Sequence, residues 1–134
     1  MALLAVDVVS AEARLFQGEA TAVYGRSIEG ELGILPGHTP MLVGLATGPV
    51  RIATPEGEGV IVAVHRGFLE CRGDQVNILA DTAELAADID VARAEAARER
   101  ALSHLSQDDY PGDARAELAR AETRLRVANG DVGV

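Results

Sequence analysis

Few side chains of this sequence could act as bases, nucleophiles or metal ligands, and they lie far apart along the chain. No histidine stands at metal-ligand spacing from another histidine, a cysteine or a carboxylate; the 3 histidines are His38, His65 and His104. No serine lies in the Gly-x-Ser-x-Gly setting of a nucleophile elbow; the serines are Ser10, Ser27, Ser103 and Ser106. We therefore expect no metal site and no catalytic activity.

The absence of lysine excludes further kinds of chemistry, because all 12 basic residues are arginines. A Walker-type phosphate loop and a Schiff base each require a lysine. The attachment point of a lipoyl or biotinyl group requires one as well. The single cysteine, Cys71, has no partner for a disulfide within the chain, which fits a reducing compartment. We expect Cys71 to be a small buried residue of a strand rather than a reactive thiol.

Charge and hydropathy argue against nucleic-acid partners and against a membrane span. The chain has 21 acidic residues and a formal net charge of −9, whereas a phosphate backbone requires a basic surface. No stretch approaches the roughly 20 apolar residues of a transmembrane helix. The apolar start, residues 1–9, contains Asp7 and has no basic segment, so we interpret it as a first strand rather than a signal peptide. We expect a cytosolic protein that reaches a membrane only through partners.

The elements that must position these side chains change in type near residue 85. Before that point, short β-branched runs alternate with turn signals, which predicts an antiparallel β-sandwich or a flattened barrel. Aromatic residues make up only 3% of the chain, so its core must consist of Val, Ile, Leu and Ala. The expected strands are residues 4–9, 14–17, 21–24, 31–34, 41–45, 50–53, 60–65, 67–72 and 75–80.

After residue 85 the pattern is helical. A first helix begins at a cap, Asp88 or Asp90; its apolar and small residues at helical spacing are Val91, Ala94, Ala97 or Arg98, Ala101 and Leu105. Residues 107–112 end this helix, and Asp113 caps a second helix of about 16 residues that closes at residues 129–130. The second helix has the spacing of an a/d seam; the seam is Ala114, Leu118, Ala121, Leu125 and Ala128.

A short turn between two helices predicts an antiparallel hairpin. Its facing stripes are rich in alanine, which buries little area, so the hairpin is held weakly. Two interpretations stay open: a mobile element and a static buttress. The seam also leaves open a protein of another class, a free-standing β-sandwich ligand-binding module that dimerises through its hairpin.

One glycine-rich segment makes the sequence recognisable. Residues 29–40 read EGELGILPGHTP, a strand that ends in a Pro-Gly turn of type II. This segment closely resembles the hallmark of the epsilon subunit family of F-type proton-translocating ATP synthases. Three further segments resemble the following strands of that family: TGPVRI at residues 47–52, GFLE at 67–70 and VNILAD at 76–81.

The resemblance covers essentially the whole chain and implies a non-catalytic subunit of the central stalk. In this family an antiparallel sandwich of about ten strands binds the gamma subunit and the c-subunit ring, and the complex couples proton flow to ATP synthesis. The family's helical hairpin can fold down or extend to the beta subunit and inhibit ATP hydrolysis. For this chain the resemblance implies a rotor-binding β domain at residues 1–86, a hairpin at 87–134, and a peripheral position on the cytoplasmic face of the cell membrane.

The apolar segment after the Pro-Gly turn is our candidate for the rotor contact, with ordinary core packing as the alternative. The candidate residues are Leu35, Pro36, His38, Pro40, Met41 and Leu42.

The resemblance also suggests a regulatory ligand, although we expect no cofactor. Some bacterial members bind ATP through the motif I/L-D-x-x-R-A, which residues 89–94 match as IDVARA. The simpler alternative is that Asp90 caps a helix and Arg93 lies on the surface. The implied nucleotide-binding residues are Glu84, Ile89, Asp90, Arg93, Ala94, Arg100, Arg120 and Arg124.

Overall fold

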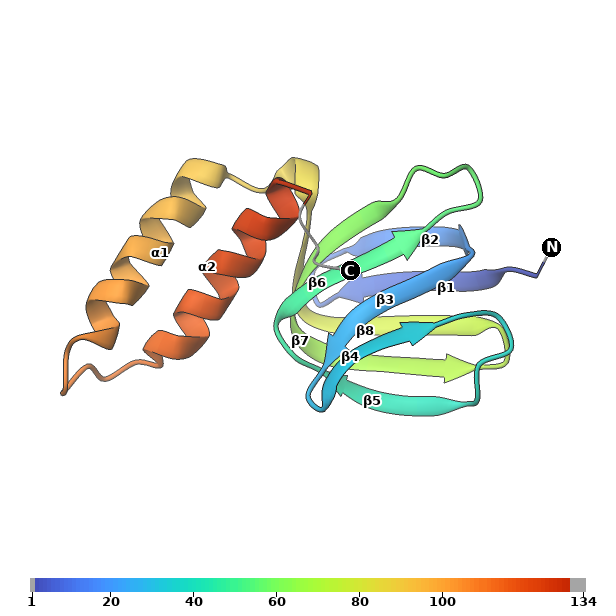
Figure 1. Cartoon of the computed structure of the whole chain (residues 1–134), viewed down its shortest axis with the longest axis horizontal. Coiled ribbons are helices and arrows are strands. Elements are labelled where there is room, and N and C mark those ends of the chain that lie inside the picture. The colour runs from blue at the N-terminus through green and yellow to red at the C-terminus, as the bar shows by residue number, and fades with distance from the viewer. Residues whose placement is uncertain (1, 131–134) are drawn as a thin grey trace.

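The computed structural model describes residues 2–130 as a body of strands with a helical hairpin at one end (Figure 1). The strands form an 8-stranded sheet system. They are β1 (Leu4–Ser10), β2 (Arg14–Ala20), β3 (Ala22–Ser27), β4 (Gly30–Ile34), β5 (Met41–Leu45), β6 (Gly48–Ala53), β7 (Val60–Arg72) and β8 (Gln75–Leu85). A short 3₁₀ helix, η1 (Ala86–Asp88), leads into α1 (Val91–Leu105) and α2 (Ala114–Ala128).

Two long strands, β7 and β8, connect the two layers of the sandwich. The second half of β7 pairs with β5, and the first half of β8 pairs with β1, which pairs with β2; these segments form sheet one. The first half of β7 pairs with β6, which pairs with β3 and through it with β4; these form sheet two. All pairings are antiparallel except β1 with β8. The predicted sandwich is confirmed, with eight strands in the described chain where about ten were expected.

The strand number is lower partly because one predicted boundary is a bend. Residues 60–65 and 67–72 were expected as separate strands but form the single strand β7. Arg66 and Gly67, at the bend, both have positive φ, 68° and 148°. A Cβ on Gly67 would lie 2.2 Å from the carbonyl oxygen of Leu79. Glycine therefore allows β7 to turn from one sheet into the other against the backbone of β8.

The core between the sheets consists of aliphatic side chains, as the composition predicts. Along β1 the buried residues Leu4, Val6 and Val8 alternate with more exposed ones, which is the period of a strand with one buried face. Cys71 is buried in the same cluster, and burial raises the pKa of its thiol, assisted by the charge of Asp74. The prediction of an inert, buried Cys71 is confirmed.

The hairpin follows its predicted caps. The Asp90 carboxylate accepts a hydrogen bond from the amide of Arg93 at 3.1 Å, so Asp90 rather than Asp88 is the cap of α1. Asp113 caps α2 in the same way, accepting from the amide of Ala116 at 3.0 Å. Gly130, with φ of 73°, closes α2. Neither helix is long and apolar enough to cross a bilayer.

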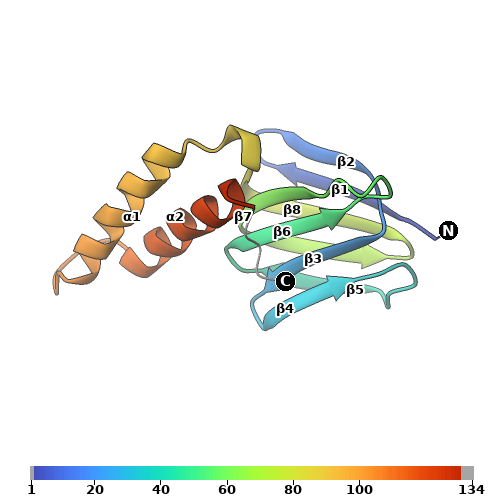
Figure 2. The same cartoon turned by 45° about the horizontal axis from the view of Figure 1, so that its top comes forward.

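Helix α2 lies between α1 and the sandwich, and both views show α1 on its far side (Figures 1 and 2). The seam residue Ala121 is buried, but so are Thr123 and Val127 on another face of α2. Val127 packs with Ala63 of β7 and Ile89 in a small cluster separate from the main core. Helix α2 thus packs against α1 on one side and against the sandwich on the other. The predicted a/d seam describes only one of these two contacts.

Candidate functional site

Most of the predicted nucleotide-binding residues gather where α1, α2 and the end of β8 meet. They line a cleft of about 690 Å³, which we call the helix cleft. Its lining includes Glu84, Asp90, Arg93, Ala94, Arg100 and Arg124. Arg120 lines an adjoining hollow together with Arg100 and Arg124. Ile89 is instead buried against Ala63 and Val127, so its place in the motif is structural.

Glu84 is held between the sandwich and α2. The Nε of Arg124 donates a hydrogen bond to its Oε1 at 2.6 Å, and the buried Nε2 of His65 lies 3.2 Å from the same oxygen. We call His65, Glu84 and Arg124 the latch, because they connect β7 and β8 to α2. In this arrangement the Glu84 carboxylate is occupied, so a nucleotide that used it would have to displace Arg124.

The latch fixes the protonation states of its members. Burial lowers the pKa of His65, and the positive charge of Arg124 lowers it further, while Glu84 opposes both effects. Burial by itself would raise the pKa of Glu84, but the hydrogen bond and charge of Arg124, helped by His65, bring this pKa below its usual value. The stable form is thus a neutral His65 beside an ionised Glu84 paired with Arg124.

Other arginines of the helix cleft are free to meet an anion. Within residues 2–130, Arg93 and Arg100 of the helix cleft form no ion pair, and neither does Arg120 of the adjoining hollow. The Asp90 carboxylate is already used in capping α1. Guanidinium groups match phosphate oxygens in geometry and charge, but four carboxylates also line the helix cleft and oppose the binding of a polyphosphate: Glu12, Glu84, Asp88 and Asp90.

The rotor-contact candidates lie at the end of the sandwich opposite the hairpin (Figure 1). The amide of His38 donates to the carbonyl of Leu35 at 3.1 Å, and Gly37 has φ of 87°, as a Pro-Gly turn requires. The amide of Gly37 also donates to Asp74 at 3.0 Å, which ties this loop to the β7–β8 turn.

The same candidates divide by exposure. Leu35, Pro40 and Leu42 are exposed, whereas Pro36 and His38 are half-buried. Met41 packs against the core of the sandwich. The core-packing interpretation is therefore correct for Met41, and the contact with the rotor stays a prediction for the exposed residues.

Sheet one has an exposed apolar surface that the sequence analysis did not identify as a whole. Its exposed fractions are high for large apolar side chains: Ile28 74%, Leu42 70%, Phe68 57% and Leu79 60%. Phe68 of β7 pairs with Leu79 of β8 on one side and with Gly44 of β5 on the other. The side chain of Ile28 lies over Gly44. We call these residues the apolar face. The strand period contained the signal: Leu69 and Cys71 point inward, so Phe68 shares the outward face with Glu70 and Arg72.

No metal site is added by tertiary structure in the described part of the chain. No group of at least 3 His, Cys, Asp or Glu residues comes together there in a way that could hold an ion.

Comparison with known proteins accounts for both parts of the chain. Residues 3–86 match the family model of the ATP synthase delta/epsilon chain beta-sandwich domain. Residues 87–129 match the model of the long alpha-helix domain of the same chain.

Individual relatives give the same result. The ATP synthase epsilon chain of Brevibacillus brevis is 50% identical over 107 residues, which cover 80% of this chain and 81% of the relative. That of Streptomyces avermitilis is 44% identical over 126 residues, covering 94% and 95%.

Solved structures share the fold at lower identity. A chain in the Euglena gracilis mitochondrial ATP synthase superposes with a TM-score of 0.74 at 22% identity, covering 96% of this chain and 79% of that one. A chain in the central stalk and c-ring structure from Tetrahymena thermophila gives 0.55 at 11% identity, covering 96% of both.

Proposed function

The chain belongs to the family of ATP synthase delta/epsilon chains, and from this membership we propose that it binds the gamma subunit and the c-subunit ring of an F-type ATP synthase. Epsilon chains are structural and regulatory subunits of that complex rather than catalytic ones. As part of the central stalk, this chain would help to couple transmembrane proton flow to ATP synthesis. Its place would be peripheral, at the cytoplasmic face of the cell membrane.

The observation that supports these partners is the apolar face of sheet one. A contiguous exposed apolar surface on a small protein marks a binding interface. We assign this face to the gamma subunit. Leu35 and Pro40, in the loop between β4 and β5, are assigned to the c-subunit ring. The stiffness of the sandwich suits a part that transmits torque, because its loops are tied to one another by hydrogen bonds such as Gly37 to Asp74.

Charge introduced into the apolar face tests this assignment. Phe68→Asp and Leu79→Asp should each abolish co-purification with the gamma subunit, since each buries an unpaired carboxylate in the interface. Gln17→Asp adds the same charge to an exposed position of β2 and should leave assembly unchanged. The measurement is subunit composition on native gels, with circular dichroism as the fold control. Normal retention of both variants would refute this placement.

The hairpin supports a second part of the proposal, inhibition of ATP hydrolysis. In the described part of the chain, α2 contacts β6 and β7 of the sandwich, with one small apolar cluster and the latch among these contacts, while α1 packs on α2. Such a module can leave the sandwich without unfolding it. When extended, it would present arginines of α2 to the beta subunit: Arg115, Arg120, Arg124 and Arg126.

Removing the hairpin tests this role. A chain that ends at Ala86 should still assemble and should raise the ATP hydrolysis rate of the complex. Shortening at residue 106 instead would leave α1 without α2, the helix on which it packs. An unchanged hydrolysis rate with normal assembly would remove the inhibitory role.

We also propose that ATP is a regulatory ligand of the helix cleft. Its support is the convergence of Arg93 and Arg100, unpaired within residues 2–130, with Arg124 around one cleft of about 690 Å³. Calorimetry of the full chain with ATP should show binding that Arg93→Gln and Arg100→Gln each weaken. Arg115→Gln, on the exposed surface of α2, is the matched control. Absence of heat at millimolar ATP would contradict the proposal.

A further inference from the structure

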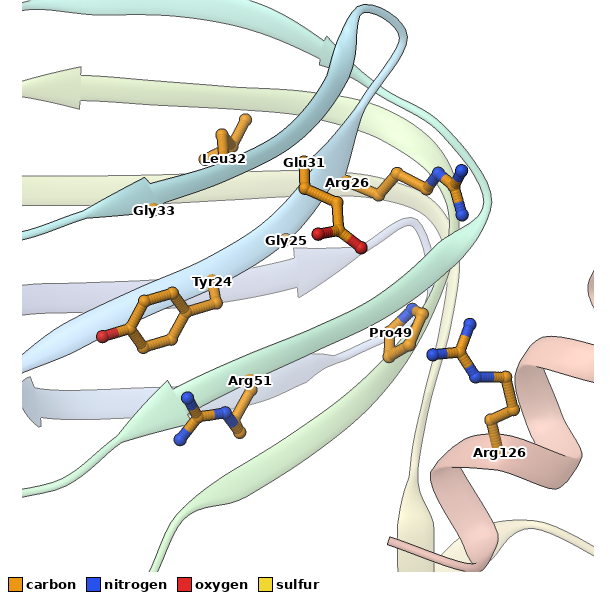
Figure 3. A pocket seen from close by; sticks show the side chains of 9 residues that line it. All are labelled: Tyr24, Gly25, Arg26, Glu31, Leu32, Gly33, Pro49, Arg51 and Arg126. Atoms are coloured by element: carbon orange, nitrogen blue, oxygen red, sulfur yellow. The ribbon is translucent and has the colours of Figure 1, made fainter. Parts of the chain in front are cut away.

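A separate basic pocket lies on the outward surface of sheet two, beside the last turn of α2 (Figure 3). It has a volume of about 290 Å³. Tyr24 and Arg26 come from β3, Arg51 from β6 and Arg126 from α2; we call this the arginine pocket. It shares no residue with the helix cleft, and its ligand goes beyond the function proposed above.

Two of its side chains are fixed in place by the sheet. Tyr24 pairs with Arg51 on one side and with Gly33 on the other. The guanidinium carbon of Arg51 lies 4.5 Å from the centre of the Tyr24 ring. A Cβ on Gly33 would approach the same ring to 3.1 Å, so this glycine leaves room for the ring to lie across β4. Arg51 is therefore held in a preorganised position, which reduces the entropy lost when it binds a ligand.

No close ion pair holds the arginines of the pocket in the described part of the chain, although Glu31 lies opposite Arg26 across β3 and β4. Within residues 2–130, none of Arg26, Arg51 and Arg126 forms an ion pair. The Nε of Arg51 is buried and has no hydrogen-bond partner there. Glu31 is the one acidic side chain in the lining. These arginines cluster in one place although the protein as a whole has a net charge of −9. The cluster therefore indicates a binding site for an anion.

We propose that the arginine pocket binds a small phosphate-bearing anion. Guanidinium groups from different directions pair with phosphate oxygens through forked hydrogen bonds. The ring of Tyr24 and the ring of Pro49 form part of the rest of the wall. A cavity of about 290 Å³ is at the lower end of ligand sites, which favours pyrophosphate or a small phosphomonoester.

Such a ligand would connect the two parts of the protein. Arg26 and Arg51 belong to the sandwich, whereas Arg126 belongs to the hairpin. A bound anion therefore makes one more contact when the hairpin is docked than when it has left. By linkage, the anion stabilises the docked hairpin, and the docked hairpin raises affinity for the anion.

Calorimetry with inorganic pyrophosphate on the full chain at low ionic strength tests the site. We expect Arg51→Gln and Arg126→Gln each to weaken binding about tenfold or more, the effect of one charge-assisted contact. Arg115→Gln, on the same helix but outside every pocket described here, should leave affinity unchanged. Arg100→Gln, in the helix cleft, measures how much of the observed binding belongs to that other site.

The outcomes separate the alternatives. Full affinity in Arg51→Gln, or loss of binding in Arg100→Gln alone, would overturn the proposal. Should Arg51→Gln fail to fold, Arg26→Gln at an exposed position provides the same test. Amide hydrogen exchange gives an independent readout: pyrophosphate should protect α2 in the wild type and not in Arg126→Gln. Neither result depends on assembly with the stalk, so failure here leaves the proposed function untouched.

Discussion

His65 is a buried side chain whose charge depends on whether the hairpin is docked. Its Nε2 lies 3.2 Å from Glu84, while Arg124 and Arg120 on α2 contribute positive charge around it. Protonation would place an imidazolium among these arginines in a buried site. Burial and the charge of Arg124 therefore lower the pKa of His65 in the docked protein. The latch connects proton binding to docking through this single residue.

This arrangement predicts a loss of stability in mild acid. A histidine with a lowered pKa binds its proton more readily in the unfolded chain, near the ordinary value of 6.5. Its contribution is therefore fully present above that value and is lost as the pH falls through the lowered pKa. Glu84, whose pKa lies below 4.5, acts in the same direction only at lower pH. Below pH 6.5, and above the range in which Glu84 titrates, the effect belongs to His65.

Thermal unfolding measured against pH checks this prediction. The melting temperature of the wild type should fall across that window, and that of His65→Gln should fall less, because the glutamine does not titrate. Equal slopes for wild type and His65→Gln would show that the latch is not the titrating group.

At the scale of elements, the bend in β7 determines how the two sheets are joined. The strand changes partners from β6 to β5 across this bend while it stays paired with β8 on both sides. Gly67 meets the backbone of Leu79 and Ala80 at the bend, so a side chain there has no space. The bend also places His65 and Phe68 on different sheets, which separates the latch from the apolar face.

Replacing Gly67 with alanine should therefore be severely destabilising, by about 3 kcal/mol or more, through a clash with the backbone of β8 and a positive φ. Gly57→Ala is the matched control, since Gly57 also has positive φ but open space around it. Its cost should be about 1–2 kcal/mol, from the backbone conformation alone. Urea denaturation gives both values, and equal costs would mean that close packing against β8 is unimportant.

At the scale of the whole molecule, the rotor-contact candidates and the hairpin lie at opposite ends of a stiff sandwich (Figure 1). The sandwich has a large aliphatic core, whereas the hairpin is held by the cluster of Ala63, Ile89 and Val127. The two parts therefore differ in their free energy of opening, and the hairpin is the part that can move while the sandwich stays assembled.

A valine-to-alanine substitution in each part distinguishes the free energy of opening of the hairpin from that of the sandwich. Val127→Ala should release the hairpin, raising hydrogen exchange in α1 and α2 but not in the strands, for a loss of about 1.5–3 kcal/mol. Val62→Ala, in the main core, should instead raise exchange throughout the sandwich.

In the assembled complex, Val127→Ala should lower ATP hydrolysis, because it favours the extended, inhibitory hairpin, whereas removal of the hairpin raises it. Increased hydrolysis in Val127→Ala would contradict the proposed direction of control.

The local features of this protein could be predicted from its sequence. Strand periodicity located most of the strands, side-chain capping located both helices, and the Pro-Gly turn and the buried Cys71 were recognised. Each of these depends on neighbouring residues in the chain, through backbone conformation and the alternation of side chains. The family resemblance, carried by residues 29–40, was likewise available from local sequence.

What only the tertiary structure decided are the contacts between distant segments. His65, Glu84 and Arg124 meet because β7, β8 and α2 pack together, and nothing in their spacing indicates it. The arginine pocket likewise joins Arg26, Arg51 and Arg126 from three elements. Val127 and Thr123 are buried because α2 packs against a sheet as well as against α1. Pairing, bending and docking depend on long-range burial, which no short window of sequence contains.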